Sequence, residues 1–228
     1  MRDCQFISKK DGIDNEYRSR NILSNFIMKY FFYIYCCIFF LLAACSDEIA
    51  LPKLSTDAVI LAFGDSLTHG NGAKAEESYP AVLEGLINRK VINAGISGEE
   101  SGPGLKRFPG LLKTHQPSLV ILCHGGNDIL RKKDIQKMES NLREMIRLTN
   151  SMKIPVILLG VPKPGLFLSA ADVYQEIADT EDVVFIEDLV SKVLSDNSLK
   201  SDRVHPNKDG YRVMAEKIHA VLKQRGAL

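Results

Sequence analysis

The sequence of 228 residues has no tryptophan, almost no net charge and only one cysteine beyond position 45. Lysine and arginine together number 29, and aspartate and glutamate 28, which leaves a formal net charge of +1. A chain this close to neutral lacks the basic character expected of a nucleic-acid-binding protein, so we expect no nucleic-acid partner. Because four of the five cysteines lie within the first 45 residues, a framework of disulfide bonds across the body of the chain is excluded.

Long apolar runs are also missing, and the longest, at residues 30–44, has only fifteen residues. A helix that spans a bilayer needs about 20 residues, so this run is short for a membrane span. It has the length of the apolar core of a secretory signal peptide, and it ends in small residues as a cleavage site does. We predict a signal peptide over residues 28–44. We hypothesise that Met28 is the true start, which would leave residues 1–27 as an unstructured, untranslated extension.

The end of this run, Leu42-Ala43-Ala44-Cys45, resembles the lipobox of bacterial lipoproteins. The resemblance implies cleavage before Cys45 and lipidation of that cysteine, with the membrane as a partner. Several acyl chains anchor a protein stably where a single chain does not, so the implied location is the bacterial cell envelope, on the periplasmic face. The alternative is an uncleaved hydrophobic segment. Residues 45–56 are expected to form a polar tether ahead of one domain over residues 57–228.

The body of the chain alternates short apolar runs with amphipathic segments. The runs predict five strands, at residues 58–63, 90–93, 118–123, 154–161 and 183–186. Apolar residues at helical spacing predict helices between them, with Ser78, Asp134 and Asn207 as candidate N-caps and residues 169–178 as a further helix. Alternating strands and helices form a parallel sheet covered on both faces. We predict an α/β fold, a three-layer α/β/α sandwich with a flavodoxin-like parallel five-stranded sheet of order 2-1-3-4-5.

The stretch from Val59 to Thr68 places a serine directly after the first predicted strand. Ser66 follows Gly64 and Asp65 at the carboxyl end of that strand, where the ligand crevice of an open α/β sheet lies. A serine held there can be a nucleophile if a base reaches it. The alternative is that Asp65 and Ser66 only cap the next helix. A Gly-x-Ser-x-Gly elbow is excluded, because Thr68 stands where that motif requires glycine.

Polar residues follow the other predicted strands as well. Gly95 follows the second strand and Asn127 the third, while His205 lies on the connection that leaves the fifth. In a sheet of order 2-1-3-4-5 the first three strands are neighbours, so the loops at their carboxyl ends converge on one crevice. Asp202, three residues before His205, can reach that histidine across one tight turn. Each of these residues also has a structural explanation, as a turn glycine, a loop amide or part of a helix cap.

Four short blocks, in this order, resemble those of the SGNH, or GDSL, hydrolases. They are Gly64-Asp65-Ser66-Leu67, Asn93-Ala94-Gly95 with Ser97-Gly98, Gly125-Gly126-Asn127-Asp128, and Asp202 with His205-Pro206-Asn207. The likeness runs from about Val59 to Leu222, and four blocks in order are specific where one alone is weak. The Glu77-Ser78-Tyr79-Pro80 stretch and residues 127–131 resemble the branch of lysophospholipases, thioesterase I and arylesterases.

The resemblance implies a chemical role for each block. Ser66 would be the nucleophile, His205 its base and Asp202 the carboxylate that orients the base, an arrangement that makes a serine hydroxyl reactive. The N–H of Ser66, the N–H of Gly95 and the side-chain amide of Asn127 would form an oxyanion hole, in which each donor lowers the barrier by about 3 to 4 kcal/mol. No cofactor is implied. No set of histidine, cysteine and carboxylate residues has metal-ligand spacing, so no metal is expected.

The implied reaction is hydrolysis of carboxylic esters or thioesters through an acyl-serine intermediate. Short or medium acyl esters, aryl esters and lysophospholipids are the implied substrates. Removal of acetyl groups from cell-envelope carbohydrate is a second interpretation, and a non-catalytic lipid-binding lipoprotein is a third. We expect the acyl pocket to be lined by the loops after Gly98 and Val161, which carry Gly102, Pro103, Pro162 and Pro164.

Cys123 and His124 depart from the branch that the sequence resembles, which has Glu and Leu at these two positions. Both residues stand at the end of the third predicted strand, directly before Gly125 and Gly126. Two interpretations are open: the pair alters the substrate pocket beside Asn127, or it reflects local repacking of the core.

Overall fold

The computed structural model describes residues 49–163 and 168–228. The predicted signal peptide, the extension before it and Cys45 lie outside these described residues. Within them, five parallel strands form one sheet of order β2-β1-β3-β4-β5, as predicted. The strands are β1 (Val59–Gly64), β2 (Lys90–Gly95), β3 (Leu119–Cys123), β4 (Val156–Leu159) and β5 (Val184–Ile186).

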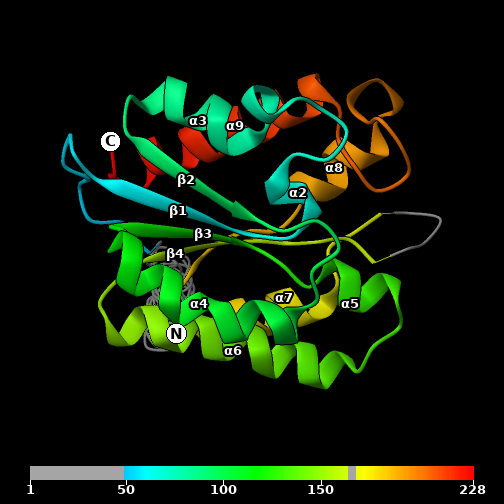
Figure 1. Cartoon of the computed structure of the whole chain (residues 1–228), viewed down its shortest axis with the longest axis horizontal. Coiled ribbons are helices and arrows are strands. Elements are labelled where there is room, and N and C mark those ends of the chain that lie inside the picture. Colours follow the sequence, from blue (N-terminus) through cyan, green and yellow to red (C-terminus); the bar gives the residue numbers. More distant parts are fainter. Residues whose placement is uncertain (1–48, 164–167) are drawn as a thin grey trace, which may run out of the picture. The chain divides into compact units, whose positions relative to one another are not determined.

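Helices cover both faces of this sheet, which confirms the three-layer arrangement (Figure 1). One face carries α3 (Tyr79–Ile87), α8 (Leu189–Ser195) and α9 (Lys208–Gln224), and the other α4 (Ser101–His115), α6 (Ile135–Ser151) and α7 (Asp172–Ala178). Two short helices, α2 (Ser66–His69) and α5 (Gly126–Leu130), begin just beyond β1 and β3. Two 3-10 helices, η1 (Ala75–Glu77) and η2 (Asn197–Leu199), precede α3 and α9. Within the described ranges, no helix is both long and apolar enough to cross a membrane.

The core lies on both faces of the central strands β1 and β3, whose side chains are almost entirely buried. The buried residues of α6 recur every three or four positions, as the amphipathic pattern predicts, and include Met138, Leu142, Met145 and Ile146. Each fully buried apolar side chain of this size stabilises the fold by about 1.5–3 kcal/mol. The packed core therefore fixes the positions of the strand ends from which the polar loops begin.

Two of the three predicted helix caps are present. Asp134 caps α6 by accepting the N–H of Lys137, and Asn207 caps α9 by accepting the N–H groups of Asp209 and Gly210. Ser78 precedes α3, but its hydroxyl donates to the carbonyl of Ala75 in η1. The prediction of a side-chain cap at Ser78 is therefore wrong, because the preceding 3-10 helix provides an acceptor for the same hydroxyl.

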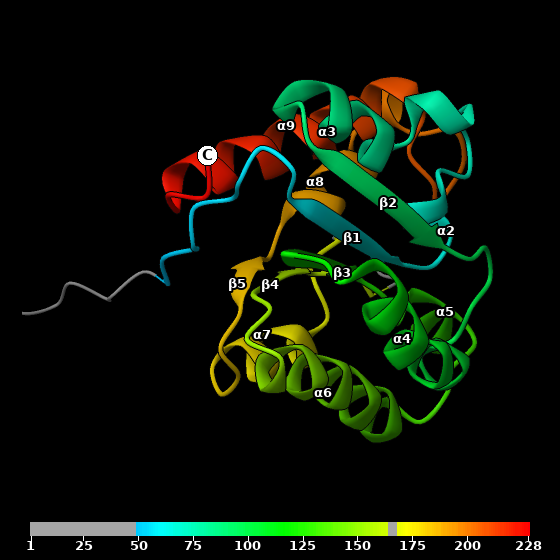
Figure 2. The ribbon, with the colours of Figure 1, turned by 60° about the vertical axis from the view of Figure 1, so that its left-hand side comes forward.

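The folded domain begins earlier than the predicted boundary at residue 57. Leu51 and Leu54 are buried, and their N–H groups donate to the carbonyl groups of Arg225 and Ala227 after α9. Figure 2 shows this first described segment beside the carboxyl end of α9. The free tether predicted over residues 45–56 therefore does not extend to these leucines, because they pack against the core.

The segment between β4 and α7 also differs from the prediction. Pro162 and Ala170 form an isolated antiparallel bridge, so the chain is still extended where the helix was expected to begin at residue 169. Helix α7 begins at Asp172. Strand β4 ends at Leu159, two positions before its predicted end at residue 161. The amino-acid pattern alone does not reveal such a bridge, because its two partners are eight positions apart in the sequence.

Candidate active site

Ser66 is the first residue of α2, directly beyond the carboxyl end of β1. The chain is tightly packed at this turn, since a Cβ on Gly64 would lie 2.1 Å from the carbonyl oxygen of Cys123. Asp65 caps α2 by accepting the N–H of Leu67 at 3.1 Å. The two interpretations of this stretch are therefore compatible, because the cap at Asp65 fixes the turn that presents Ser66.

Ser66, His205 and Asp202 lie in one hydrogen-bonded row. The hydroxyl oxygen of Ser66 lies 3.0 Å from Nε2 of His205, and Nδ1 of His205 lies 2.8 Å from Oδ2 of Asp202. The other carboxylate oxygen of Asp202 accepts the N–H groups of Val204 and His205. Burial acts to raise the pKa of Asp202, but the hydrogen bonds from His205 and the backbone outweigh it and lower that pKa. An ionised Asp202 keeps a proton on Nδ1, which leaves Nε2 to accept from Ser66.

The loop that carries His205 is fixed from two sides. Ser201 donates its N–H to the carbonyl of His205 at 2.9 Å, and Gly72 fits so closely that a Cβ there would lie 2.1 Å from the hydroxyl oxygen of Ser201. The hydroxyl of Tyr211 on α9 donates to the carbonyl of Asn71 at 2.7 Å. The segments that carry the serine and the histidine, 139 residues apart in the sequence, are therefore joined by direct contacts.

A cavity of about 210 Å³ opens beside Ser66 and His205. Its polar lining includes Asn71, Ser97 and Asn127, and its apolar lining consists of Leu67, Leu130, Val161, Pro162, Leu194 and Val204. Small-molecule pockets commonly measure about 300–1,000 Å³, so this one is small. It suits a small, mainly apolar group placed against the serine hydroxyl.

Gly95 is not placed for the oxyanion role that the resemblance implies. Its N–H donates to Oδ1 of Asn93 at 3.0 Å, and Gly95 does not line the cavity. Its close contact is with α2 instead, because a Cβ there would lie 2.1 Å from the backbone nitrogen of His69. Gly98, in the same sequence block, lines the cavity in the left-handed conformation with φ +76°. Within the described residues, the N–H of Gly98 has no hydrogen-bond acceptor.

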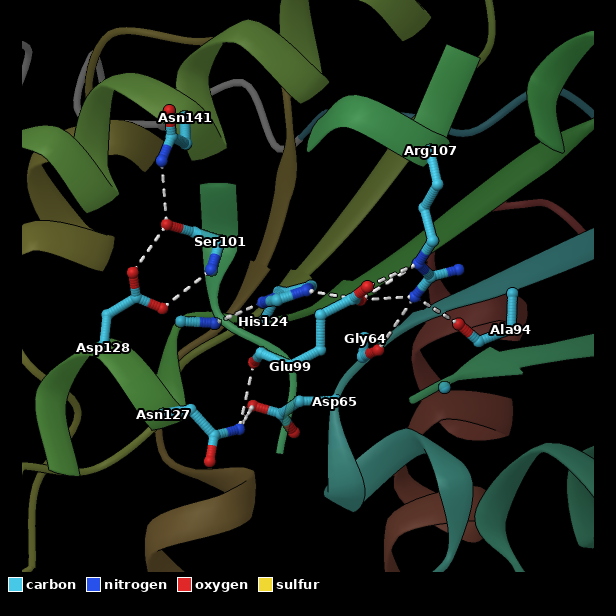
Figure 3. Close-up of polar contacts among 12 residues, drawn as sticks. Gly64, Asp65, Ala94, Glu99, Ser101, Arg107, His124, Asn127, Asp128 and Asn141 are labelled. Atoms are coloured by element: carbon cyan, nitrogen blue, oxygen red, sulfur yellow. Dashed lines mark hydrogen bonds and ion pairs between the residues drawn. The ribbon is translucent and has the colours of Figure 1, made fainter. Parts of the chain in front are cut away.

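Asn127 lines the cavity on α5, and its amide connects three segments. Nδ2 of Asn127 donates to the carbonyl of Glu99 at 3.0 Å and to Oδ2 of Asp65 at 3.3 Å (Figure 3). Burial raises the pKa of Asp65, whose carboxyl group is almost inaccessible to water. The amide is thus held at the edge of the cavity, and its longer bond, to Asp65, is the one that a ligand oxygen can more readily replace.

Comparisons with known proteins agree with this geometry. Residues 62–213, more than half of the chain, match the GDSL-like lipase/acylhydrolase family. The chain belongs to this family.

Relatives of this GDSL hydrolase include the thioesterase 1/protease 1/lysophospholipase L1 of Escherichia coli K12, which is 32% identical over 165 residues, covering 69% of this chain and 79% of that protein. The arylesterase of Vibrio mimicus is 33% identical over 193 residues, covering 78% of this chain and 91% of the relative. Among solved structures, the crystal structure of TesA matches with a TM-score of 0.67 and 28% identity, covering 73% of this chain and 99% of TesA.

The expected pocket lining of the GDSL hydrolase is only partly correct. Val161 and Pro162 line the cavity as expected, but Gly102 and Pro103 do not, because they belong to the first turn of α4. Pro164 lies outside the described residues. Sequence reasoning also missed the apolar residues of α5 and α8 on this side, since such short helices carry no periodic pattern that shows which face turns to a cavity.

Cys123 and His124 of the GDSL hydrolase are fully buried and do not line the cavity. Neither side chain is therefore part of the cavity lining, so any effect on the pocket beside Asn127 must be indirect. Burial raises the pKa of the Cys123 thiol well above its usual value, so this cysteine stays protonated and unreactive. The ring of His124 is buried as well, and both of its nitrogens are hydrogen-bonded, one to Glu99 and the other to the N–H of Gly125.

Proposed function

We propose that this GDSL hydrolase cleaves carboxylic esters and thioesters through a covalent acyl-Ser66 intermediate. The supporting observation is the row of Asp202, His205 and Ser66, with separations of 2.8 and 3.0 Å. The oxygen of Ser66 bonds to the carbonyl carbon while its proton moves to Nε2 of His205. The bond to the leaving group then breaks, and His205 gives that group its proton. Water attacks the acyl group, its proton passes through His205 to Ser66, and the acid departs.

The negative oxygen of the tetrahedral intermediate would be bound by the N–H groups of Ser66 and Gly98 and by the amide of Asn127. Gly98 takes the place first assigned to Gly95, because it lines the cavity and its N–H lacks an acceptor within the described residues. Asn127 would exchange its 3.3 Å bond to Asp65 for a bond to the oxyanion. Loss of one such donor lowers kcat by about 10²–10³-fold.

The substrates we propose carry a short acyl group. A cavity of about 210 Å³ with a mainly apolar lining holds such a group without a long chain. The related thioesterase/lysophospholipase and arylesterase support activated aryl esters, thioesters and lysophospholipids as classes to test. Acetylated carbohydrate is a further class to test, because its acetyl group is small enough for this cavity.

A substrate panel tests this proposal. Purified protein is offered p-nitrophenyl esters from acetate to palmitate, acyl-coenzyme A, lysophosphatidylcholine and acetylated xylan. We expect fastest turnover of the short aryl esters, with kcat reduced at least about 10³-fold in Ser66→Ala and unchanged in the matched variant Ser78→Ala. Turnover of acetylated glycan alone would favour the carbohydrate esterase. Lipid binding without any turnover would show the non-catalytic lipoprotein.

We also propose that a lipid on Cys45 anchors the protein to the periplasmic face of the bacterial cell envelope. The support is the Leu42-Ala43-Ala44-Cys45 stretch at the end of an apolar run of signal-peptide length. Radiolabelled palmitate should enter the wild-type protein, which should sediment with membranes, and Cys45→Ser should abolish both. An unlabelled wild-type protein would contradict the anchor. Peptides from residues 1–25 in the mature protein would contradict Met28 as the start.

A further inference from the structure

His124 is fully buried at the start of the loop after β3, and its ring contacts Glu99 in the loop after β2 (Figure 3). Nδ1 of His124 accepts the N–H of Gly125 at 2.8 Å. Because a backbone N–H can only donate, Nδ1 carries no proton, and the neutral ring has its proton on Nε2. Nε2 lies 3.2 Å from Oε2 of Glu99, to which it donates. The contact between His124 and Glu99 is therefore a hydrogen bond with a defined direction.

Glu99 is held in turn by Arg107 on α4. Nε of Arg107 donates to Oε1 of Glu99 at 2.8 Å, and Nη2 donates to Oε2 at 2.6 Å. Cζ of Arg107 lies 4.3 Å from the centre of the Phe63 ring, and Nη2 of Arg107 donates to the carbonyl of Ala94 at 2.9 Å. Burial acts to raise the pKa of Glu99, but the hydrogen bonds from His124 and Arg107 outweigh it and lower that pKa to about 2. A fixed carboxylate thus faces His124 at neutral pH.

The proposed oxyanion donors lie close by, Gly98 in the loop after β2 and Asn127 at the start of α5. Glu99 directly follows Gly98, and its backbone carbonyl accepts the amide of Asn127 at 3.0 Å. His124 begins the short loop that leads into α5, whose second residue is Asn127. The His124–Glu99 bond therefore runs beside the Asn127–Glu99 bond and joins the same two segments.

The neighbouring helix α4 leaves room for the imidazole ring of His124 because it has a glycine at the point of contact. Gly104 on α4 faces the ring so closely that a Cβ there would lie 2.5 Å from Nε2 of His124. The carbonyl of His124 accepts the hydroxyl of Tyr174 at 2.7 Å, which fixes the backbone on the other side. The ring is thus constrained from α4, from its own backbone and from Glu99.

We propose that His124 is a positioning residue for the oxyanion hole. Its Nε2–H bond to Glu99 holds the loop of Gly98 at a set distance from the start of α5, where Asn127 lies, so that both donors point to one oxygen. This inference rests on the proposed function and adds a residue that neither touches the substrate nor lines the cavity. Donors must lie within a few tenths of an ångström of their best positions to act fully in an oxyanion hole.

Three variants at position 124 separate positioning from packing. His124→Gln keeps a donor that can reach Glu99, and His124→Leu removes it at similar volume. We expect His124→Leu to lower kcat for a short p-nitrophenyl ester about tenfold with KM nearly unchanged, which is less than the loss of a donor itself, and His124→Gln to retain most of kcat. If His124→Leu does not fold, His124→Asn replaces it, since Asn can accept from Gly125 but is too short to reach Glu99. Wild-type kcat in the donor-lacking variant, or equal losses in both variants, would overturn the proposal.

Cys123→Ala is the matched control. This neighbour is equally buried, and its thiol hydrogen-bonds to Thr68 of α2 rather than to either loop. We expect it to lower the melting temperature without changing kcat. If the control loses kcat in proportion to its loss of stability, the effect at position 124 is merely structural.

A double-mutant cycle with Asn127→Ala gives the decisive readout, measured as the rate of labelling by a phosphonate that mimics the tetrahedral intermediate. If His124 acts by placing Asn127, the added loss from His124→Leu should shrink or disappear when Asn127 is already alanine. Fully additive losses would overturn the positioning role. A wild-type protein that the phosphonate does not label would instead overturn the proposed function, and the positioning role with it.

Discussion

At the scale of single residues, the carboxylate of Asp202 uses both of its oxygens. One accepts Nδ1–H of His205, and the other accepts the backbone N–H groups of Val204 and His205. The side chain is about half exposed (54%), so water can replace part of what it provides. Its main contribution is to fix the imidazole in the tautomer and the direction that Ser66 needs.

Asp202→Asn should therefore lower kcat strongly without unfolding the protein. The amide can present a donor where Nδ1–H needs an acceptor, which favours the wrong tautomer of His205. We expect a fall of about 10²–10⁴-fold in kcat, with the exposure of this side chain favouring the lower part of that range. The control is Asp196→Asn, since Asp196 accepts the N–H of Ser198 in a comparable surface turn. A variant at 202 as active as that control would contradict the assigned role.

At the scale of elements, the start of α4 depends on a residue of α5. The carboxylate of Asp128 accepts the N–H of Ser101 at 2.8 Å and its hydroxyl at 2.7 Å, and Nδ2 of Asn141 on α6 donates to the same hydroxyl. A buried carboxylate at a helix start satisfies free N–H groups and meets the positive end of the helix dipole. No residue next to Ser101 in the sequence caps α4 with its side chain, so the local sequence does not mark the start of this helix.

Asp128→Asn should destabilise the fold. It replaces charge-assisted hydrogen bonds, worth about 1.5–3 kcal/mol, with neutral and partly mismatched ones in a buried position. We expect the free energy of unfolding in urea to fall by about that amount. Asp134→Asn is the matched control, because the exposed cap of α6 tolerates asparagine with little loss. Equal losses of unfolding free energy in the two variants would show that the contact between Asp128 and Ser101 does not stabilise the protein.

At the scale of the whole molecule, the order of the strands explains why the position of the candidate active site could be predicted from the sequence. Parallel strands place their carboxyl ends at one edge, so the loops after β1 and β3 had to meet there, and strand order, convergence and the meeting of Ser66 with His205 were all predictable. Details that depend on the path of the backbone were not predictable. Gly98 rather than Gly95 reaches the cavity because the loop turns through a left-handed conformation after β2 ends.

The free energy of unfolding should also depend on whether the carboxyl group of Glu99 is ionised. Its pKa is lowered to about 2 from an ordinary 4.5, so the ionised form favours the folded state above about pH 4.5 and that contribution is lost as the pH falls toward 2. Glu99→Gln should be less stable at pH 7 and should show a shallower loss of unfolding free energy across this window. Glu144→Gln, at an exposed position of α6, should follow the wild-type curve. If the unfolding free energies of Glu99→Gln and wild type changed in parallel with pH, the lowered pKa of Glu99 would be contradicted.

The central claim is that Ser66, activated by His205, is the nucleophile. Its most direct test is peptide mass spectrometry after incubation with a fluorophosphonate. We expect one covalent adduct, on the peptide that contains Ser66, which is lost in Ser66→Ala and forms orders of magnitude more slowly in His205→Ala. An adduct on another residue, or no adduct on a protein that still hydrolyses esters, would contradict it.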